Sequence, residues 1–408
     1  MSRQQSSPTA ERSEPSGAHN RLNVRVVPAA EVPPGRGARS TDPLGVHDRL
    51  DVRVIPAAEL STGECARWAA LQDADPMFAS PFLSPEFTMC AARIWPGVEV
   101  AVLESSNRVV GFFPFERSGR RGCPVGRRIA FHQGAILEPG VDVDPRALVR
   151  ACGLREWHFT NLLTSQAAFA PNHRGTGVSL RADLSAGFAS YLETVTEARP
   201  KMVAEIRRKG RKIARDIGPL RLVAQEHDAS VFDDIERLKL DKYRCTGPLR
   251  DASCVELMRR MLATDTPRFA GCMTALYAGD RLIAGSIGVR SRTMFVGIII
   301  AYDEELARHS PGSVLLLEML EAFGNDGITT FDFGYGDQEY KRRWASDALE
   351  VAEGFVAVNR LARAKCEVRE AVRERQLRLL NDGALGPDRA VGRMLRTLRE
   401  EVDIRMSR

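Results

Sequence analysis

The chain has 408 residues, of which 44% are hydrophobic and 27% are charged, and its formal net charge at pH 7 is +5. These values are typical of a globular protein, and they exclude a wholly disordered, collagen-like or coiled-coil chain. The length exceeds that of one usual domain, so we expect two domains with additional segments. The longest apolar run, residues 294–302, is about half as long as a transmembrane helix needs. No secretory signal is visible, so we expect a cytoplasmic protein with reduced cysteines. The eight cysteines are spread singly without a C-x-x-C pair, so we expect no metal site.

The N-terminal residues 1–48 are predicted to be disordered. Six Pro, four Gly and six Ser make up one third of this leader, a composition that cannot bury a core. The leader also contains a copy of a later segment, because residues 21–31 repeat as 49–59 with nine identities in eleven positions. We expect the second copy to form the first strand. The first copy is then a loose part of the leader or, alternatively, an extra edge strand.

The pattern from residue 49 to 186 predicts a mixed α/β domain. Helices are expected over 61–72, 85–94 and 145–153, and strands over 49–59, 98–103, 108–115, 128–131 and 157–163. The strands 98–103 and 108–115 flank a Ser-Ser-Asn turn and predict a hairpin.

Residues 187–359 predict a second domain with a clearer pattern. Helices are expected over 188–198, 202–217, 231–243, 254–263, 313–323 and 338–343, and strands over 221–225, 272–277, 282–290, 293–302, 327–333 and 351–358. Three meander strands, one helical crossover and a further strand indicate a mixed sheet and not a Rossmann sheet. Residues 360–408 carry thirteen Lys or Arg and eight acids, and predict a basic helical tail.

The most informative stretch is 329–344, TTFDFGYGDQEYKRRW, in which a strand ends in two glycines and a short helix follows. Loops at strand ends commonly build functional sites, and glycine lets a ligand approach the backbone closely. The acids, tyrosines and lysine of this stretch are candidates for a base, an acid and a cation in catalysis: Asp332, Tyr335, Asp337, Tyr340 and Lys341. A capped turn with surface charges is the alternative interpretation.

A second stretch, 302–313, joins the long apolar strand to an apolar helix. Ser310 is suited to an N-cap and Pro311 to a first helical turn, and the free N–H groups of a helix start can bind phosphate. The candidates for binding a donor are Arg308, Ser310, Gly312, Ser313 and Val314. A plain N-cap is the common alternative.

A third stretch is basic. Residues 201–221 carry eight Lys or Arg and two acids, and such a cluster inside a folded region can bind an anion or a partner. We take as candidates for substrate binding Arg207, Arg208, Arg211 and Lys212, with Tyr302 from the second stretch. The alternatives are a solvated helix face and a site for RNA phosphate.

The pattern D-F-G-x-G-x-x-x-Y-K-x-x-W at 332–344, preceded by an S-P-G helix start and an apolar helix, resembles the GNAT-type acetyltransferase domain associated with cellulose and other polysaccharide biosynthesis. That family is similar to the Fem-type aminoacyl transferases of peptidoglycan. Further matches are the basic helix 206–217 and the segment GFFPF at 111–115. The resemblance extends over about 50–358 in the order of elements and is specific mainly at 302–344.

The resemblance implies two tandem GNAT-like folds, with acyl transfer in the second fold and an acyl-thioester donor, usually acetyl-CoA. The ordinary pyrophosphate loop of the family, Q/R-x-x-G-x-G/A, is absent, and only Arg308 and residues 311–313 remain of it. The use of CoA is therefore an open point, since Fem-type relatives take aminoacyl-tRNA.

We therefore expect an acyltransferase that moves an acyl group, in the first instance acetyl, to an amine or hydroxyl of a sugar or cell-envelope precursor. Asp332 or Asp337 would be the base, and Tyr335 or Tyr340 would protonate the thiolate. Lys341 would stabilise an oxyanion or hold an acidic group of the substrate. Three alternatives stay open: an aminoacyl-tRNA-dependent transferase that binds RNA through 207–212, a long-chain acyl donor, and a non-catalytic component of a polysaccharide synthesis complex.

Overall fold

The structure is a computed structural model that describes residues 24–26, 50–242 and 247–382. The predicted disorder of the leader and the helical prediction beyond residue 382 therefore lie outside the described residues. Within the leader, β1 (Val24–Val26) pairs in parallel with β2 (Leu50–Pro56). The first copy of the repeated segment thus contributes an edge strand, as the alternative interpretation expected.

The described strands form one continuous mixed sheet. Its order is β1-β2-β3-β4-β5-β7-β14-β8-β13-β12-β11-β10-β9, and β6 pairs with β4. The first half of the chain supplies β2, β3 (Val98–Ser105), β4 (Arg108–Ser118), β5 (Arg121–Cys123), β6 (Ile136–Leu137) and β7 (Glu156–Leu163). The remaining strands are β8 (His173–Asp183), β9 (Leu220–Val223), β10 (Ala270–Ala278), β11 (Arg281–Arg290), β12 (Met294–Tyr302), β13 (Thr330–Tyr335) and β14 (Asp347–Ala357). This mixed α/β architecture confirms the predicted fold class.

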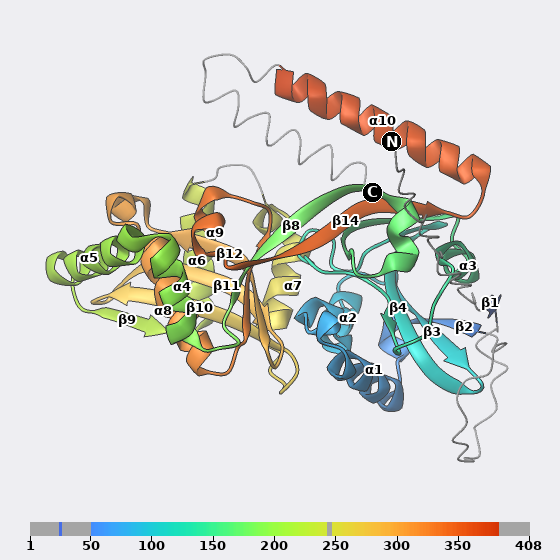
Figure 1. Cartoon of the computed structure of the whole chain (residues 1–408), viewed down its shortest axis with the longest axis horizontal. Coiled ribbons are helices and arrows are strands. Elements are labelled where there is room, and N and C mark those ends of the chain that lie inside the picture. Colours follow the sequence, from blue (N-terminus) through green and yellow to red (C-terminus); the bar gives the residue numbers. More distant parts are fainter. Residues whose placement is uncertain (1–23, 27–49, 243–246, 383–408) are drawn as a thin grey trace, which may run out of the picture.

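Two long strands, β8 and β14, connect the two halves of the molecule (Figure 1). β14 lies between β7 and β8, so the last strand that the structure describes completes the sheet of the first half. β8 in turn pairs with β13 of the second half. The boundary predicted at 186/187 therefore falls within a continuous sheet, and the division into two domains stays a prediction.

The helices cover the sheet and agree with most of the predicted ranges. They are α1 (Thr62–Ala74), α2 (Pro85–Ala92), α3 (Pro145–Ala151), α4 (Phe188–Ala198), α5 (Pro200–Asp216), α6 (Ala229–Lys242), α7 (Ala252–Leu262), α8 (Pro311–Asn325), α9 (Glu339–Trp344) and α10 (Arg360–Asp382). Local signals fix several starts. Ser61 and Glu64 form a capping box at α1, and Pro occupies the first turn of α2, α3, α5 and α8. No helix in the described ranges is long and apolar enough to cross a membrane.

The strand predictions differ from the structure in several places, and the short strands β5 and β6 were not predicted. Residues 128–131, expected as a strand, form a turn and an irregular segment. β8 has no counterpart among the predicted strands, because Gly175 and Gly177 weaken the alternation of apolar and polar residues. A side chain at Gly175 would meet Glu353, and one at Gly177 would meet the ring of Tyr335. Both glycines are therefore required by neighbours that are distant in sequence.

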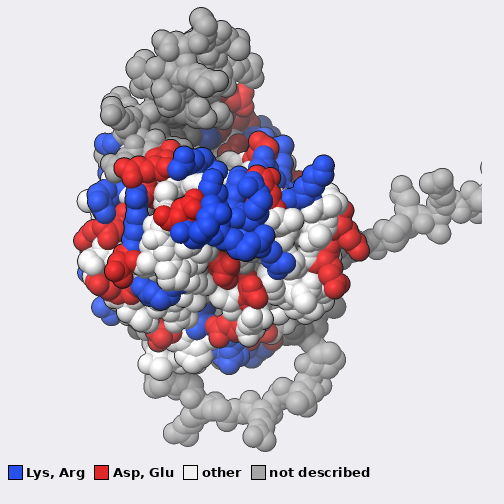
Figure 2. Space-filling model, turned by 90° about the vertical axis from the view of Figure 1, so that its left-hand side faces the viewer, with Lys and Arg blue, Asp and Glu red and all other residues white. Residues whose placement is uncertain are grey.

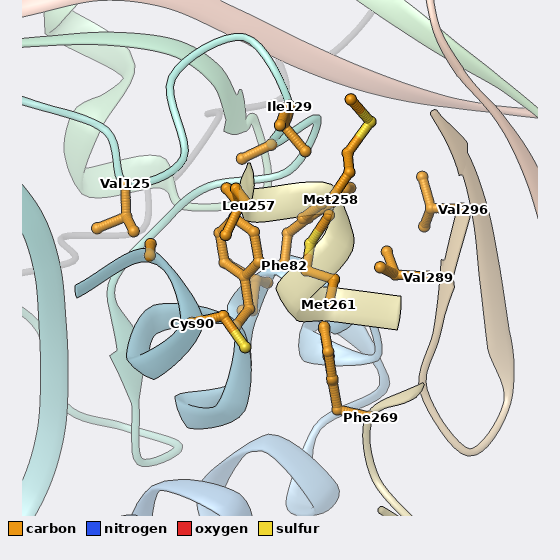
Figure 3. Packing of buried hydrophobic residues seen from close by; sticks show 14 of the residues in the cluster. Phe82, Cys90, Val125, Ile129, Leu257, Met258, Met261, Phe269, Val289 and Val296 are labelled. Carbon is orange, nitrogen blue, oxygen red and sulfur yellow. The ribbon is translucent and has the colours of Figure 1, made fainter. Parts of the chain in front are cut away.

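The largest apolar cluster of the described residues is shared by both halves (Figure 3). Phe82, Val125 and Ile129 come from the first half and pack with Leu257 and Met258 of α7. All five are almost completely buried. The segment that follows Ile129 is therefore held firmly against the second half.

We expect the two halves to unfold together because of this shared cluster. Leu257→Ala should lower the free energy of unfolding by about 2–5 kcal/mol, the usual cost of such a cavity, and should move a single transition. Denaturant titration followed by tryptophan fluorescence and far-UV circular dichroism measures this. Leu361→Ala, at a side chain that is 68% exposed, is the matched control with little effect. Two separate transitions in the native protein would contradict the shared core.

Candidate active site

A cavity lies where β12 and β13 separate. The two strands pair in parallel for only three residues, from Met294–Thr330 to Val296–Asp332. Just beyond, the register of β12 against β11 shifts, so that Ile298 is an extra residue in a β-bulge. Residues of both strands line a cavity of about 220 Å³ at this point. The separation of two parallel strands thus creates a pocket inside the sheet instead of at its edge.

Three of the five predicted catalytic residues line this cavity. They are Tyr335 at the end of β13, and Tyr340 and Lys341 on α9. The two tyrosines are 46% and 40% exposed, whereas Lys341 is only 5% exposed. The cavity therefore has an ammonium in its wall and two phenol groups at its surface.

The ammonium of Lys341 is held by the backbone of the turn that precedes it. Nζ donates to the carbonyl oxygens of Gly334 at 2.8 Å and Tyr335 at 2.7 Å. These are its only acceptors among the residues that the structure describes, so the third N–H is available to a ligand. Gly334 and Gly336 have φ values of +80° and +103°, a conformation that favours glycine. The two glycines thus let the chain turn so that its carbonyls face the lysine.

The environment of Lys341 lowers its pKa to about 8. Burial is the main cause, because it disfavours the charged form. The ammonium of Lys239 on α6 acts in the same direction, and the carboxylate of Asp332 opposes both. Lys239 also lines the cavity, and its Nζ donates to the carbonyl of Ile300 at 2.8 Å. The cavity therefore carries two lysines, of which one changes its charge close to physiological pH.

Asp332 lies below the cavity and does not line it. The residue is fully buried, and its Oδ1 accepts hydrogen bonds from Ser179 Oγ at 2.6 Å and Gly334 N at 2.7 Å. Its Oδ2 lies 3.4 Å from Nε2 of His132, which belongs to the first half. On the other side of the ring, His132 Nδ1 lies 2.8 Å from Ser80 Oγ. Asp332 therefore holds the glycine turn in place and is not positioned to contact an acceptor.

In space, Ser80, His132 and Asp332 contact one another in the order serine, histidine, aspartate, as in a serine hydrolase triad. They do not form a nucleophilic site. Their exposed fractions are 4%, 0% and 0%, so a substrate cannot reach the serine. The hydroxyl of Ser80 also accepts from the backbone N–H of Phe82. The arrangement is a buried polar link between the two halves.

Asp337 is also outside the cavity. It forms an exposed ion pair with Arg342 of α9, and it is absent from the residues that line the cavity. The structure thus brings together the tyrosines and the lysine of the predicted set, and it leaves both carboxylates outside.

The start of α8 differs in detail from the predicted phosphate site. Ser310 adopts a left-handed conformation with φ of 51°, and its carbonyl accepts the N–H groups of Ser313 and Val314. Gly312 lies against the ring of Tyr302, which a side chain there would meet at 3.1 Å. Of the three predicted backbone donors, Ser313 and Val314 are therefore engaged within the helix. Their engagement leaves the N–H of Gly312 as the candidate donor without an acceptor among the described residues.

The neighbouring candidates Arg308 and Ser310 bond to local partners. Arg308 Nε donates to His309 Nε2 at 2.9 Å, and Lys209 Nζ of α5 donates to Ser310 Oγ at 2.9 Å. The second bond joins the start of α8 to the basic helix. Side chains of α5, more than backbone N–H groups, thus supply positive charge at this end.

Most of the basic cluster of 201–221 lies on α5, and Arg221 lies on β9. Val203, Ile206 and Ile213 are buried on one face of α5, and Arg207, Arg208, Arg211 and Lys212 occupy exposed or half-buried positions. Figure 2 shows Lys and Arg gathered on the side of the molecule where α5 lies.

The family comparison agrees with this geometry. Residues 200–342, which include α5, the cavity and most of α9, match the model described as Acetyltransferase (GNAT) domain. The match comprises 143 of the 408 residues. The second half of the chain therefore carries a GNAT-type N-acyltransferase domain. The protein is accordingly an enzyme of the N-acyltransferase class.

Solved structures with similar folds share little sequence with this chain. The C-terminal domain of a putative lysylphosphatidylglycerol synthetase from Agrobacterium fabrum has 12% identity and a TM-score of 0.48, over 76% of this chain and 97% of the other. FemX has 9% identity and a TM-score of 0.48, over 75% and 97%. A tandem GNAT protein of the clavulanic acid pathway has 12% identity and a TM-score of 0.45, over 76% and 99%. The sequence matches none of the curated proteins.

Several residues around the cavity could not be found from the motifs. Phe131 lines the cavity from the first half, and His132 and Ser179 contact Asp332. All three lie more than 150 positions before Lys341 in the sequence. Lys239 carried one signal, since it is one of only seven lysines among 58 basic residues.

We expect the activity to depend on the ammonium form of Lys341. Since its pKa is about 8, the ammonium predominates below pH 8 and is lost above it, so acyl transfer should decline on the alkaline side of that pH. Lys341→Ala should lower turnover by about a hundredfold, the usual effect of losing one oxyanion donor. Lys341→Arg should restore little of the rate but should remove the alkaline decline, because guanidinium keeps its charge. The pH–rate profiles of the three proteins measure this, and an unchanged decline in the arginine variant would contradict it.

We expect His132 to stabilise the site through Asp332. His132→Ala should lower the free energy of unfolding by about 1–3 kcal/mol, since the buried Oδ2 of Asp332 loses its neighbour. A double-mutant cycle with Asp332→Asn should show that the two effects are not additive. Additive effects in chemical denaturation would mean that the two side chains do not interact.

Proposed function

We propose that the protein transfers an acyl group, in the first instance acetyl, from an acyl-CoA thioester to an amine or hydroxyl of a sugar or cell-envelope precursor in polysaccharide biosynthesis. The observation that carries this proposal is the buried ammonium of Lys341 in a cavity between separated parallel strands, within a domain that matches the GNAT family model.

The reaction requires three events. The acceptor nitrogen or oxygen forms a bond to the thioester carbonyl carbon, and the carbonyl oxygen becomes negative. The carbon–sulfur bond then breaks and the thiolate leaves. The acceptor releases one proton and the thiolate takes up one proton. The products are therefore an amide or ester and a free thiol.

The residues of the cavity suit these events. The free N–H of Lys341 would donate to the negative oxygen, where a buried cation acts most strongly. Tyr335 or Tyr340 would protonate the thiolate. Since neither Asp332 nor Asp337 reaches the cavity, the proton of the acceptor would leave through water.

An anionic carrier of the acyl group fits the opposite end of the domain. Arg207, Arg208 and Arg211 lie on the solvent face of α5, and Lys209 joins this helix to the start of α8. Arginine side chains bind phosphate through two parallel hydrogen bonds. The donor would therefore be held by side chains at its phosphates and would extend its acyl group between β12 and β13.

Incubation with acetyl-CoA, a long-chain acyl-CoA and a panel of amino sugars tests this function. We expect release of free thiol and an amide product with the mass of the acetylated amino sugar, and at least about a hundredfold less of both with Lys341→Ala. Preference for the long-chain donor would extend the acyl group and keep the reaction class. Equal rates in the native protein and in Lys341→Ala would contradict the proposed site.

The exposed arginines of α5 also favour a second candidate, transfer from aminoacyl-tRNA. Binding of tRNA should then weaken steeply with salt. Arg207→Gln with Arg211→Gln should weaken the binding of every tRNA, whatever its sequence. For the CoA donor, the same double variant should raise the KM for acetyl-CoA with little change in kcat. If the protein transfers an acyl group from neither donor, the remaining alternative is a non-catalytic component of a polysaccharide synthesis complex.

A further inference from the structure

A second cavity of about 270 Å³ lies between the first half of the chain, the strands β8 and β14, and α10. We call it the arginine cavity because guanidinium groups make up most of its charged lining. The arginines are Arg121, Arg127, Arg128, Arg174, Arg369 and Arg373, and the carboxylates are Asp251, Glu353 and Glu370. The cavity therefore brings together twice as many cations as anions.

Six of the lining charges are engaged with one another or with the protein behind them. Arg127 donates to the carboxylate of Glu116 from Nε at 3.1 Å and from Nη2 at 2.5 Å, and it stacks on Trp95. Asp251 caps α7 by accepting from the N–H of Ser253.

Arg373 and Arg369 also have close carboxylate partners. Arg373 lies 3.8 Å from Glu353 and 3.4 Å from Glu370. Arg369 bonds to Glu156 and approaches His158 and the thiol of Cys366. A carboxylate, an imidazole and a thiol thus surround this guanidinium. Since Arg369 already supplies the positive charge there, the group does not call for a metal ion.

Two arginines have only distant carboxylates. The nearest to Arg121 is Glu156 at 3.9 Å, which already accepts from Arg369, and the buried Nε of Arg121 has no hydrogen-bond partner. Arg174 stacks on Phe355, donates to the carbonyl of His173 at 3.0 Å and lies 4.0 Å from Glu367. Only 23% and 31% of these two side chains are exposed. Partly buried cations without a close carboxylate favour the binding of an anion.

The arginine cavity lies close to the active-site cavity. Arg128 lines the first and Phe131 lines the second, and three residues span at most about 11 Å. β8 gives a second connection, because it carries Arg174 at the arginine cavity and Gly177 under the ring of Tyr335. The two cavities are therefore neighbours along β8 and along the segment 128–131.

We propose that the arginine cavity binds an anionic group of the acceptor, a phosphate or a carboxylate, so that the enzyme selects anionic amino sugars over neutral ones. This inference rests on the proposed acyl transfer, for which it names the class of acceptor. Arg121 and Arg174 make the deciding contacts with the anion, and the rest of the acceptor extends along β8 toward the active-site cavity. The face of α5 is then left to the donor.

Direct binding of three amino sugars to the full chain, without a donor, tests this inference by calorimetry. Glucosamine carries no anion, glucosamine 6-phosphate carries a phosphate and muramic acid carries a carboxylate. We expect at least one anionic sugar to bind ten times or more tightly than glucosamine, and the pair identifies which anion is preferred. Arg121→Gln with Arg174→Gln should reduce this preference to less than threefold, and the double replacement by Lys should retain most of it.

Arg237→Gln with Arg292→Gln is the matched control, because it removes two guanidinium groups that are 66% and 58% exposed away from both cavities. The control should keep the full preference. Equal affinities for all three sugars in the native protein would overturn the inference. A preference that survives in the folded Arg121→Gln, Arg174→Gln protein would overturn it as well, because the anion would then bind elsewhere. Since no donor is present, failure of acyl transfer leaves these results unchanged.

Discussion

The separation of β12 from β13 is the constraint on which the site depends. Two parallel strands normally continue side by side and leave no space between them. Here the bulge at Ile298 and the turn through Gly334 and Gly336 end the pairing after three residues. Backbone carbonyls at the end of β13 then need a donor, and a buried lysine supplies it. The same lysine is the charged group of the cavity, so the support of the turn and the chemistry of the site share one side chain.

The first half of the chain supports this turn from below. Asp332 fixes the N–H of Gly334, and His132 approaches the other oxygen of the carboxylate. His132 lies three residues after Ile129, which belongs to the shared apolar cluster. The family match begins at residue 200, so a half of the protein that lies outside the match determines the shape of the site within it.

The sequence predicted the mixed sheet, most helices and the active stretch, because these depend on local periodicity and on turn residues. Tyr335, Tyr340 and Lys341 were found since they lie within one short motif. The motif did not show that Asp337 lies outside the cavity, because its exposed ion pair with Arg342 depends on the orientation of α9. The role of Asp332 depends on Ser179 and His132, which come from other elements. β8 was missed for the same reason, since its two glycines leave space for the side chains of Glu353 and Tyr335.

The position of β14 has a consequence for the synthesis of the chain. β7 ends at Leu163, yet its neighbour in the sheet begins at Asp347. The ribosome must therefore deliver most of the second half before the first half can complete its sheet. Until then β7 and β8 present unpaired edges, which are prone to join other strands. Such a long-range pairing forms slowly, so the nascent chain is most exposed to aggregation during the interval between the emergence of these two strands and that of β14.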